Sequence, residues 1–495
     1  MKILKNKERK QIFLSALLLV IIIALYVEFN IIISKINIPE SDITEDKVYT
    51  ISEESKEKIT NLEKNLKISL VDFEKYDDFV YAEDILYIIK QYEKLSDKIE
   101  VEQYEDELTE ETNNQYPYII FSTEDKARKV YLNELYSYKY NISYGNQEES
   151  YLIEPMITNS ILSVTEGFDG GVYICLDKSI YSEKMYTTFV NIVGVLGYDT
   201  YGLNLSTDKN IPDNCKCLVI PPLVQRNEEG EIRVSDFSDE EKEIIVNYIN
   251  NGGNILFLQE SKSVVQGDTP NLDYIMSLYG VSISDGIVCQ ADNKIQNIPS
   301  YIYPTINTNN SIFKNINDKS KVCIFDSGKI DIVSEEEANK LNVSYNVLIQ
   351  SRDNSYLRKD LSNTSLDKTE DDENIDGAVL AVYAEKNIDE KKSKAIVFSN
   401  SIIATNSSIF LKDVIGNRKL AVNAILLDDN IDLISDSIKS LINSENTVFY
   451  TKTKYNIMPS ANLLTDGITL KIIFVIPMLI ILIGYIVWKH RKNKM

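Results

Sequence analysis

The sequence predicts an α/β protein whose central sheet is doubly wound and flavodoxin-like, with a smaller α/β domain before it and a transmembrane helix at each end. Two observations predict this arrangement. Helix-type and strand-type segments alternate through residues 171–258 in the order β-α-β-β-α-β, the pattern of a mostly parallel sheet covered by helices. Long apolar stretches lie near both chain ends, each beside a basic cluster, which is the pattern of membrane anchors.

The first apolar stretch predicts a transmembrane helix over residues 12–33. It begins IFLSALLLVIIIALYV and continues past Glu28 as far as Ile33, and roughly 20 apolar residues are enough to span a bilayer. No small-x-small cleavage signal follows it, so we expect an uncleaved anchor rather than a signal peptide. Residues 1–11 form a basic tail that is predicted to stay in the cytoplasm.

Residues 45–150 are predicted to form a small α/β domain. The spacing of Thr50 and Glu53 favours a capping box at its first helix. The polar turn TEDKA separates two short apolar runs, as in a hairpin. In chain order we expect a helix Glu53–Lys64, a strand Leu66–Phe73, a helix Phe79–Leu95, and strands Ile99–Gln103, Tyr118–Ser122 and Lys129–Leu132.

The clearest elements of the chain lie in Ser235–Glu260. Ser238 and Glu241 have capping-box spacing, so their side chains can satisfy free amides at a helix start. The glycines at 252 and 253 can take the left-handed backbone that ends a helix. Ile255–Leu258 is entirely apolar, as in a strand covered on both faces. Helix, glycine turn and buried strand together are typical of a parallel α/β sheet.

This segment belongs to a larger domain, predicted over residues 151–445 with insertions. Residues 290–320 show no clear element, and residues 351–376 are predicted to be an acidic, polar loop without regular structure. The other expected helices are Glu154–Thr165, Lys184–Leu196, Leu272–Leu278, Asn417–Leu427 and Ile431–Ile442. The other expected strands are Gly171–Leu176, Thr200–Leu205, Cys217–Ile220, Val281–Cys289, Lys321–Ile324, Tyr345–Ile349, Val379–Tyr383 and Lys394–Ser399.

The second apolar stretch predicts a transmembrane helix over residues 471–488. Lys471 can extend its charge toward the headgroups, and Trp488 suits the membrane interface. Residues 489–495 form a second basic tail. Because positive residues stay in the cytoplasm, both ends are predicted to be cytoplasmic and residues 34–470 extracytoplasmic.

The charge of the chain excludes one class of partner. The net charge is −23, yet each basic end carries +4, so the remainder carries −31. Such an acidic body repels nucleic acid and anionic lipid surfaces. We therefore expect no nucleic-acid partner.

The five cysteines do not indicate a disulfide framework. They are Cys175, Cys215, Cys217, Cys289 and Cys323, an odd number spread over a long segment. Several lie in apolar strand-like runs, so we expect small buried side chains. Cys215 and Cys217 lie one strand repeat apart, which is awkward for a disulfide, and two cysteines alone do not make a zinc site.

The sequence argues against familiar catalytic machinery in the predicted outer segment. The only histidine is His490, in the predicted cytoplasmic tail, which excludes a Ser-His-Asp triad, a Cys-His pair or a histidine-ligated metal outside. Ser261 and Lys262 follow the apolar strand, but adjacent residues seldom face each other, and no nucleophile elbow is present. No phosphate or dinucleotide glycine motif has a usable context, so no cofactor is expected.

Carboxylates are the remaining candidates for chemistry. With 75 aspartates and glutamates, a pair at glycosidase spacing can be neither excluded nor located. The acidic loop Asp371–Asp376 lacks the spacing of a calcium loop. We favour a solvated acidic surface, predict no metal and no catalytic residue, and leave the binding residues unassigned.

Eight stretches spread over the chain carry a family resemblance. They are DITEDKVYTISEESKEKITNL (42–62), EPMITNSILSVT (154–165), GYDTYGLNLS (197–206), IPDNCKCLVIPP (211–222), FSDEEKEIIVNYINNGGNILFL (237–258), TPNLDYIMSLYGVSISDGIV (269–288), AIVFSNSIIATNSS (395–408) and GNRKLAVNAI (416–425). In this order, with an anchor at each end, they resemble the GldG-like proteins. That family is the auxiliary component of ABC-type transport systems associated with gliding motility.

The resemblance implies an extracytoplasmic protein that works beside an ABC-2-type permease and a cytoplasmic ATPase. It also implies a sheet domain related to class I glutamine amidotransferase-like folds. One departure matters, because family members often have a Gly-His-Gly-Glu turn after the first strand of this domain. Here Asp177-Lys178-Ser179 follows that strand, so a role belonging to that turn is not carried over, and neither is gliding.

Three functions remain open on the sequence. The first is a non-enzymatic accessory subunit of a bacterial ABC-2-type transporter in the cell membrane, which binds a cargo or a cell-envelope component. The second is an anchored envelope enzyme that acts on glycans through carboxylates. The third is an envelope scaffold or sensor independent of a transporter. The two predicted anchors, the absence of histidine between them and the family resemblance favour the first.

Overall fold

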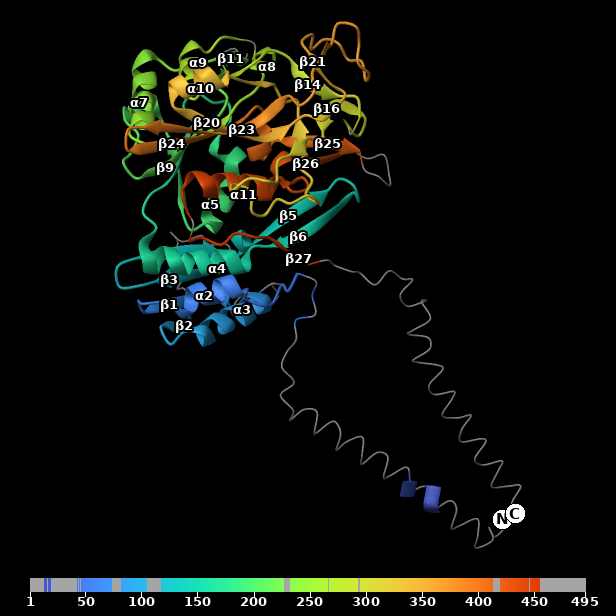
Figure 1. The fold of residues 1–495 in the computed structure, drawn as a ribbon. Coiled ribbons are helices and arrows are strands. Elements are labelled where there is room, and N and C mark those ends of the chain that lie inside the picture. The colour runs from blue at the N-terminus through green and yellow to red at the C-terminus, as the bar shows by residue number, and fades with distance from the viewer. Residues whose placement is uncertain are drawn as a thin grey trace, which may run out of the picture. The chain divides into compact units, whose positions relative to one another are not determined.

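The computed structural model describes residues 13–15, 17–18, 42, 44, 46–73, 82–104, 117–226, 232–265, 267–292, 294–412, 419–444 and 446–454. By contacts between residues the chain divides into two units, Met1–Lys47 and Val48–Met495. The second unit contains the folded body (Figure 1).

The two predicted transmembrane helices, over residues 12–33 and 471–488, lie outside the described residues apart from 13–15 and 17–18, which are helical. Within the ranges that the structure describes, no helix combines the length and the apolar character needed to cross a bilayer.

The predicted α/β class is confirmed, because a ten-stranded mixed sheet with helices on both faces forms the centre of the body. Five parallel strands are its core, in the spatial order β8-β7-β9-β12-β24. Counted along the chain this is the order 2-1-3-4-5, with the reversal between β7 and β9, as in one common type of doubly wound sheet. Their bounds are β7 Gly171–Cys175, β8 Asp199–Leu203, β9 Cys215–Ile220, β12 Ile255–Leu258 and β24 Lys391–Phe398.

Antiparallel strands extend the sheet beyond β24. β23 pairs with β24, and beyond β23 the sheet branches to β19 and β13 on one path and to β20 and β17 on the other. Because β23 runs antiparallel to both β24 and β20, β20 points the same way as the five parallel strands. The bounds are β23 Val379–Ile388, β19 Ile330–Ile332, β13 Val281–Ile283, β20 Val343–Gln350 and β17 Thr305–Ile306.

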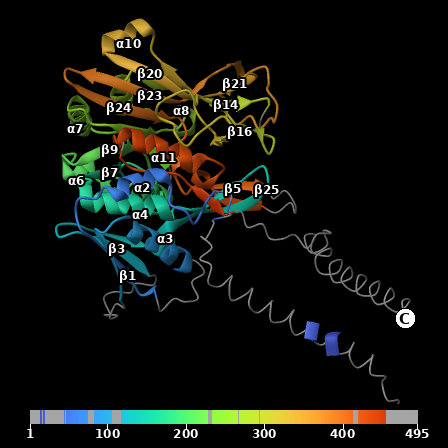
Figure 2. The same ribbon diagram turned by 60° about the horizontal axis from the view of Figure 1, so that its bottom comes forward.

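Helices cover both faces of this sheet (Figures 1 and 2). Leu256 and Leu258 of β12 belong to a core shared with α4, α5 and α11, whereas Ile255 and Phe257 belong to a second core shared with α7 and α9. Successive side chains of a strand point to opposite faces of the sheet. Because helices cover both faces at β12, every residue of this strand is apolar. The helices are α4 Ile153–Leu162, α5 Thr187–Val195, α7 Asp239–Asn250, α9 Pro270–Ser277 and α11 Asn430–Leu441.

The predicted start and end of α7 are confirmed. Ser238 accepts a hydrogen bond from the backbone of Glu241, whose side chain accepts one from the backbone of Ser238, so the capping box is complete. Gly252 has the left-handed backbone, with φ of 86°. Gly253 is required for another reason, because a Cβ there would lie 2.4 Å from the ring of Tyr248.

The N-terminal part of the body has its own four-stranded sheet, in the order β2-β1-β3-β4. The predicted elements are present, but Ser52 rather than Thr50 caps the first helix, by accepting a hydrogen bond from the backbone of Ser55. The elements are α2 Glu53–Thr60, β1 Leu66–Val71, α3 Ala82–Leu95, β2 Ile99–Tyr104, β3 Tyr118–Ser122 and β4 Ala127–Tyr131.

A small sheet that the sequence did not indicate follows. β5 (Tyr136–Asn141) and β6 (Asn146–Tyr151) form a hairpin, and β27 (Lys452–Lys454), near the end of the described chain, pairs with β6. The domain boundary predicted between residues 150 and 151 therefore falls inside β6.

The second half of the body departs most from the sequence prediction. The helix predicted over Asn417–Leu427 is wrong, because its described part forms β26 (Lys419–Asn423), which pairs with β25 (Ser408–Lys412), and a short 3₁₀ turn. The region 290–320 contains short strands. The remaining elements are α6 Leu205–Asp208, β10 Val224–Arg226, β11 Ile232–Val234, α8 Lys262–Val265, β14 Ile287–Gln290, β15 Lys294–Ile295, β16 Ile298–Ile302, β18 Ile324–Phe325, α10 Glu335–Leu341, β21 Ser355–Arg358 and β22 Glu373–Asn374.

The loop predicted over residues 351–376 is also more structured than expected. It contains β21 and β22, and Arg358 at the end of β21 is buried. Its guanidinium group donates to both carboxylate oxygens of Asp372, at 3.1 and 2.9 Å. It also donates to the backbone carbonyls of Ser365 and Asp367, at 2.7 and 3.0 Å. One buried cation therefore organises this acidic segment.

The cysteines are small buried side chains, as predicted, and all five are free. Only Cys215 keeps some exposure to solvent. Burial raises the pKa of Cys215 to about 11 and that of Cys289 to about 12, so very little thiolate, the reactive form, exists at neutral pH.

We therefore expect the native full-length chain, in detergent at pH 7, to react very slowly with a disulfide-forming thiol reagent such as Ellman's reagent. Five thiols should react promptly once denaturant is added, because unfolding removes the burial that raises their pKa. A thiol that reacts at the rate of a free cysteine before unfolding would contradict this arrangement. The reaction is followed by absorbance, with and without denaturant.

Candidate functional site

The carboxyl ends of the parallel strands are the first place to look for a functional site. In doubly wound sheets, ligands bind in the crevice outside these ends, at the point where the strand order reverses. Here the reversal lies between β7 and β9, and the segments at this edge begin at Leu176, Pro221, Gln259 and Ser399. β20 points the same way, so the turn that follows Gln350 lies at this edge too.

A polar network occupies the reversal point between β7 and β9. The hydroxyl of Ser206 donates to Asp177 Oδ2 at 2.9 Å and lies 2.7 Å from Glu241 Oε1. Lys178 Nζ lies 3.3 Å from the same Glu241 oxygen. Gln225 donates to the backbone carbonyl of Asp177. Asp177 and Lys178 follow β7 at the position of the Gly-His-Gly-Glu turn in the GldG-like proteins. Here they bond to α6 and to the start of α7.

Glu260 is the most perturbed carboxyl group at this edge. It follows the buried strand β12 by two residues, and its side chain keeps partial contact with solvent. Ser401, which follows β24, donates to Glu260 Oε1 from both its backbone N–H and its hydroxyl group. The pKa of Glu260 is raised to about 7, mainly by burial and to a smaller degree by the nearby Asp326 carboxylate, while the hydrogen bonds from Ser401 oppose the shift. The group can therefore gain or lose a proton near neutral pH.

The surroundings of Glu260 contain both polar and apolar side chains. Tyr181 and Ser401 share a hydrogen bond, with their hydroxyl oxygens 3.2 Å apart. Asp326 accepts a hydrogen bond from Ser300 at 2.6 Å, and burial raises its pKa as well. A cavity of about 30 Å³ is lined by Glu260, by the Lys262 and Asp273 side chains, and by four apolar side chains, Leu223, Leu272, Met276 and Ile283. This volume holds about one water molecule.

Replacing Glu260 with glutamine should change how stability depends on pH. A carboxyl whose folded pKa is near 7, against about 4.3 when unfolded, binds its proton more tightly in the native state. The wild-type chain therefore loses stability as pH rises through this window, and Glu260→Gln does not. From pH 4 to pH 8 the variant should gain about 2 kcal/mol relative to wild type, a value reduced for the group's solvent contact.

The measurement is urea unfolding of both proteins across that pH range. Other carboxyl groups titrate in both proteins, so the difference between them isolates Glu260. Glu390→Gln, at an exposed position, is the matched control and should show no such trend. A difference between Glu260→Gln and wild type that stays constant with pH would show that this carboxyl titrates normally.

In the Ser261–Lys262 pair, considered and disfavoured from the sequence, the two side chains bond to different partners. The Ser261 hydroxyl group lies 3.3 Å from the backbone nitrogen of Ser263, whose N–H donates to it. Lys262 Nζ bonds to Asp273 Oδ2 at 2.7 Å. Within the part of the chain that the structure describes, no group of three or more histidine, cysteine, aspartate or glutamate side chains is placed to hold a metal ion. His490 lies outside the described residues.

A second constellation joins the two ends of the folded body. Glu154, at the start of α4, accepts a hydrogen bond from the backbone N–H of Ser52 at 2.6 Å. Its other oxygen lies 2.5 Å from Nζ of Lys452, and the side chains of both residues are almost fully buried. Tyr450 adds hydroxyl contacts to Ser52 and Ser55, at 2.9 and 3.1 Å. We call these five residues the clasp.

The charge of Glu154 in the clasp is balanced by that of Lys452. Burial by itself would raise the pKa of Glu154, but the charge of Lys452 and the hydrogen bonds from Lys452, Tyr450 and Ser52 hold it below its usual value. Lys452 also donates to the backbone carbonyl of Thr50. The first and last segments of the described body are thus hydrogen-bonded to each other, and both bond to Glu154 of α4, the last through a buried ion pair.

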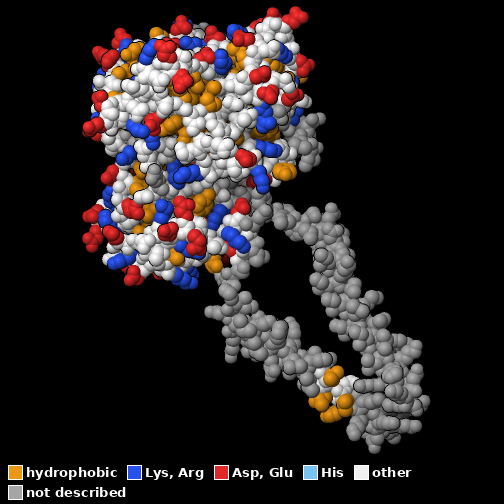
Figure 3. Space-filling view, viewed as in Figure 1, with side chains coloured by type: hydrophobic (Ala, Val, Ile, Leu, Met, Phe, Trp, Pro, Cys, Tyr) orange, Lys and Arg blue, Asp and Glu red, His pale blue; other side chains and the backbone are white. Residues whose placement is uncertain are grey.

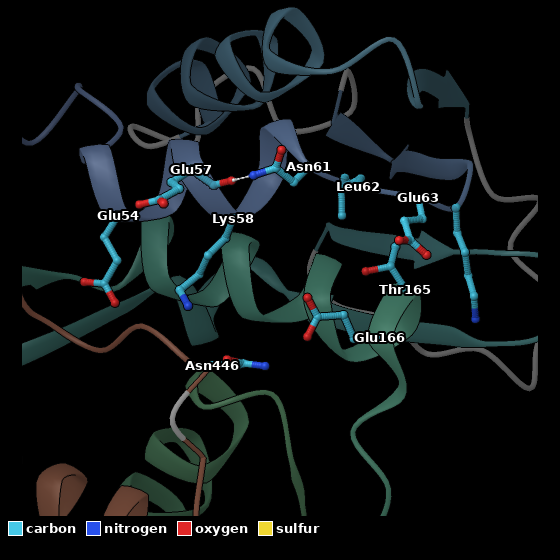
Figure 4. Close-up of a pocket in the computed structure, with 10 residues that line it drawn as sticks. Glu54, Glu57, Lys58, Asn61, Leu62, Glu63, Thr165, Glu166 and Asn446 are labelled. Carbon is cyan, nitrogen blue, oxygen red and sulfur yellow. Dashed lines mark hydrogen bonds between the residues drawn. The ribbon is translucent and has the colours of Figure 1, made fainter.

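A wide polar groove lies along α2 (Figure 4), the helix that contains Ser55 of the clasp. Its volume is about 770 Å³, and α2 forms one wall while the turn after α4, with Asn446, forms the other. The ionic side chains that line it are Glu54, Glu57, Lys58, Glu63, Lys64 and Glu166. On the face shown in Figure 3, acidic side chains lie among lysines and arginines over the whole body. The groove therefore resembles the rest of this surface and has no distinct chemistry.

Sequence reasoning missed both Glu260 and the clasp. Glu260 could have been found, because it is an acidic residue two positions after a fully apolar strand, and such a strand is typical of a buried parallel sheet. The clasp leaves no local signal, since Ser52 and Tyr450 lie 398 positions apart.

Comparisons with known proteins add little. No family model matches the chain, and no curated protein does. Among solved structures, the mmIFT52 N-terminal domain aligns with a TM-score of 0.38 at 11% identity, over 57% of this chain and 100% of that one. The exo-beta-1,4-mannosidase Op5Man5 from Opitutaceae bacterium strain TAV5 aligns with a TM-score of 0.24 at 9% identity, over 48% and 32%. Neither likeness is close enough to support an argument about family or function.

Proposed function

We propose that this chain is a membrane-anchored accessory subunit of an ABC-2-type transporter. Its body lies outside the membrane between two anchors and binds a cargo or a cell-envelope component, without catalysis. Its partners are a permease and a cytoplasmic ATPase. The ten-stranded sheet is related, in this proposal, to class I glutamine amidotransferase-like folds, and the 2-1-3-4-5 strand order is in keeping with that relation.

The clasp is the observation that supports this proposal most. The predicted anchors flank the body, and the clasp bonds the body's first segment, at Ser52, to its last, at Lys452. The described body therefore begins and ends at one cluster of bonded residues, and we propose that both anchors dock on the same partner. A body linked in this way suits a subunit that responds to a membrane partner.

The direct test is purification of the tagged full-length chain from its native membranes in mild detergent. The proposal predicts that a permease and an ATPase co-purify in fixed ratio. Gly484→Leu, in the second predicted span, should reduce the yield of permease, because small residues allow close helix packing in membranes. Ile486→Leu, which keeps a large apolar side chain in the same span, is the matched control. If neither partner is recovered with the wild-type chain, the transporter assignment fails.

Glu260 favours one alternative, an envelope enzyme that uses carboxylates. A carboxyl group with a pKa near 7 at a strand end is suited to general acid or base chemistry. Turnover of an envelope glycan by the purified chain, abolished by Glu260→Gln, would support this alternative over the binding subunit. Retention of full activity in that variant would exclude Glu260 as the catalytic group.

A further inference from the structure

A second pocket lies at the carboxyl edge of the sheet, where β20 ends and the chain turns into β21. Its volume is about 370 Å³. β21 lies beside the end of the ten-stranded sheet in both ribbon views (Figures 1 and 2). Because β20 points the same way as the parallel strands, the pocket lies at the same edge of the sheet as their carboxyl ends, away from the reversal between β7 and β9. It is lined in part by Asp292, Thr305, Gln350, Arg352, Asp353 and Gly377.

Arg352 supplies a positive guanidinium group whose orientation is fixed by two hydrogen bonds. Its Nε donates to the backbone carbonyl of Tyr303 at 2.8 Å, and its Nη2 donates to that of Pro304 at 3.4 Å. Among the described residues, Nη1 has no hydrogen-bond partner. A guanidinium held on one side by carbonyls presents its remaining donors in a fixed plane, and such a plane matches a carboxylate.

Negative groups line the same pocket. Asp292 accepts a hydrogen bond from the side-chain amide of Asn354 at 2.9 Å, so its carboxylate is also held in place. Asp353 follows Arg352 directly in the chain and lines the pocket with it. A ligand with a single negative charge would meet these carboxylates as well as the guanidinium. The lining therefore matches a ligand that carries both charges.

The backbone around the pocket is held by hydrogen bonds, while the side chains of residues 352–354 are exposed to solvent. Ser351 exchanges two hydrogen bonds with the backbone of Ala378, at 2.8 and 2.9 Å, and the Ser355 hydroxyl donates to the carbonyl of Arg352 at 2.6 Å. Gly377 lines the pocket with a left-handed φ of 65°, and no atom lies within 4 Å of where its Cβ would be. The missing side chain leaves that space open.

We propose that this pocket binds a small zwitterion of the amino-acid or dipeptide class. The ligand carboxylate pairs with Arg352, and its ammonium group pairs with Asp292 and Asp353. Thr305 and Gln350 offer hydroxyl and amide groups to the ligand backbone, and a neighbouring groove of about 340 Å³ that shares these two residues accommodates a longer peptide. This assignment does not depend on the transporter proposal.

The test is calorimetric titration of the full-length chain in detergent with alanyl-alanine. We expect binding of the dipeptide, and loss of binding for its N-acetylated and C-amidated forms, because each lacks one charge. Arg352→Gln should weaken binding by at least about tenfold, because a charge-assisted hydrogen-bonded pair contributes more than a tenfold change in the dissociation constant. Lys359→Gln removes the same charge outside the pocket and should bind as wild type does.

Gly377→Asn provides an independent check, because asparagine tolerates the left-handed backbone but places a side chain in the open space. It should block the dipeptide while the thermal unfolding midpoint stays near that of wild type. The proposal is overturned if alanyl-alanine does not bind, if the amidated form binds equally well, or if Arg352→Gln or Gly377→Asn leaves the affinity unchanged.

Discussion

Replacing Glu154 with alanine is expected to lower the free energy of unfolding by about 3–5 kcal/mol. The substitution leaves the buried Lys452 ammonium group without its counter-charge, and the backbone N–H of Ser52 without its acceptor. A buried charge that loses its partner keeps the full cost of leaving water. The measurement is urea unfolding of the full-length chain in detergent, followed by circular dichroism.

Two further variants show whether the effect belongs to the ion pair. Asp169→Ala removes an exposed partner of Lys126, at 2.8 Å, and should leave the unfolding midpoint almost unchanged because exposed pairs contribute little. The double variant Glu154→Met with Lys452→Met should recover much of the loss, since an apolar pair of similar volume leaves no buried charge. If Glu154→Ala unfolds at the wild-type urea concentration, the clasp does not hold the body together.

Acid should weaken the clasp in a predictable direction. The pKa of Glu154 is held below its usual value, so its contribution to stability is fully present above the unfolded pKa of about 4.3. That contribution is lost as pH falls through the folded pKa, when the carboxylate gains a proton. Glu154→Ala and wild type should therefore converge in stability in strong acid.

Replacing Arg358 with alanine is the second change with a large expected effect. It leaves the Asp372 carboxylate buried without its cation, and it removes the donor to the carbonyls of Ser365 and Asp367. Burial alone would raise the pKa of Asp372, and Arg358 holds it down. We expect a loss of about 3–5 kcal/mol from this buried pair, together with rapid proteolysis between residues 359 and 372.

Limited proteolysis with mass spectrometry identifies the cleavage sites, and urea unfolding gives the stability. Lys359→Ala breaks a neighbouring pair with Glu373 whose side chains are more than half exposed, so it should change neither readout. Equal protease sensitivity of this segment in wild type and Arg358→Ala would mean that Arg358 does not organise it.

Local patterns were enough to predict much of the central sheet. The capping box of α7 and the apolar run of β12 depend on neighbours within a few residues, and both are confirmed. β12 is buried on both faces, so its apolar character is required at every position. The alternation of helices and strands likewise predicted the parallel order around it.

Sequence patterns did not predict the structure where residues that contact each other lie far apart in the chain. In β5 the exposed fraction of Tyr138 is 48% while Ser137 is buried, so burial there does not follow side-chain hydrophobicity. The sequence predicts a helix where β26 lies, because its short apolar run fits the repeat of a helix as well as that of a strand. Pairing with β25 makes it a strand. The clasp at Glu154 forms only when distant segments meet, so the helix expected over Glu154–Thr165 carried no sign of it. The composition of residues 351–376 predicted a solvated acidic loop, because composition does not show that Arg358 is buried against Asp372.

The central claim is that the body lies outside the membrane between two anchors whose ends are cytoplasmic. Single cysteines can be placed at Tyr144→Cys, in an exposed turn, and at Asn493→Cys, in the predicted second tail, because the native thiols are buried or poorly reactive. With a membrane-impermeant maleimide on intact cells, the account predicts rapid labelling of Tyr144→Cys and labelling of Asn493→Cys only after permeabilisation. Labelling of Asn493→Cys in intact cells, or protection of Tyr144→Cys, would contradict it.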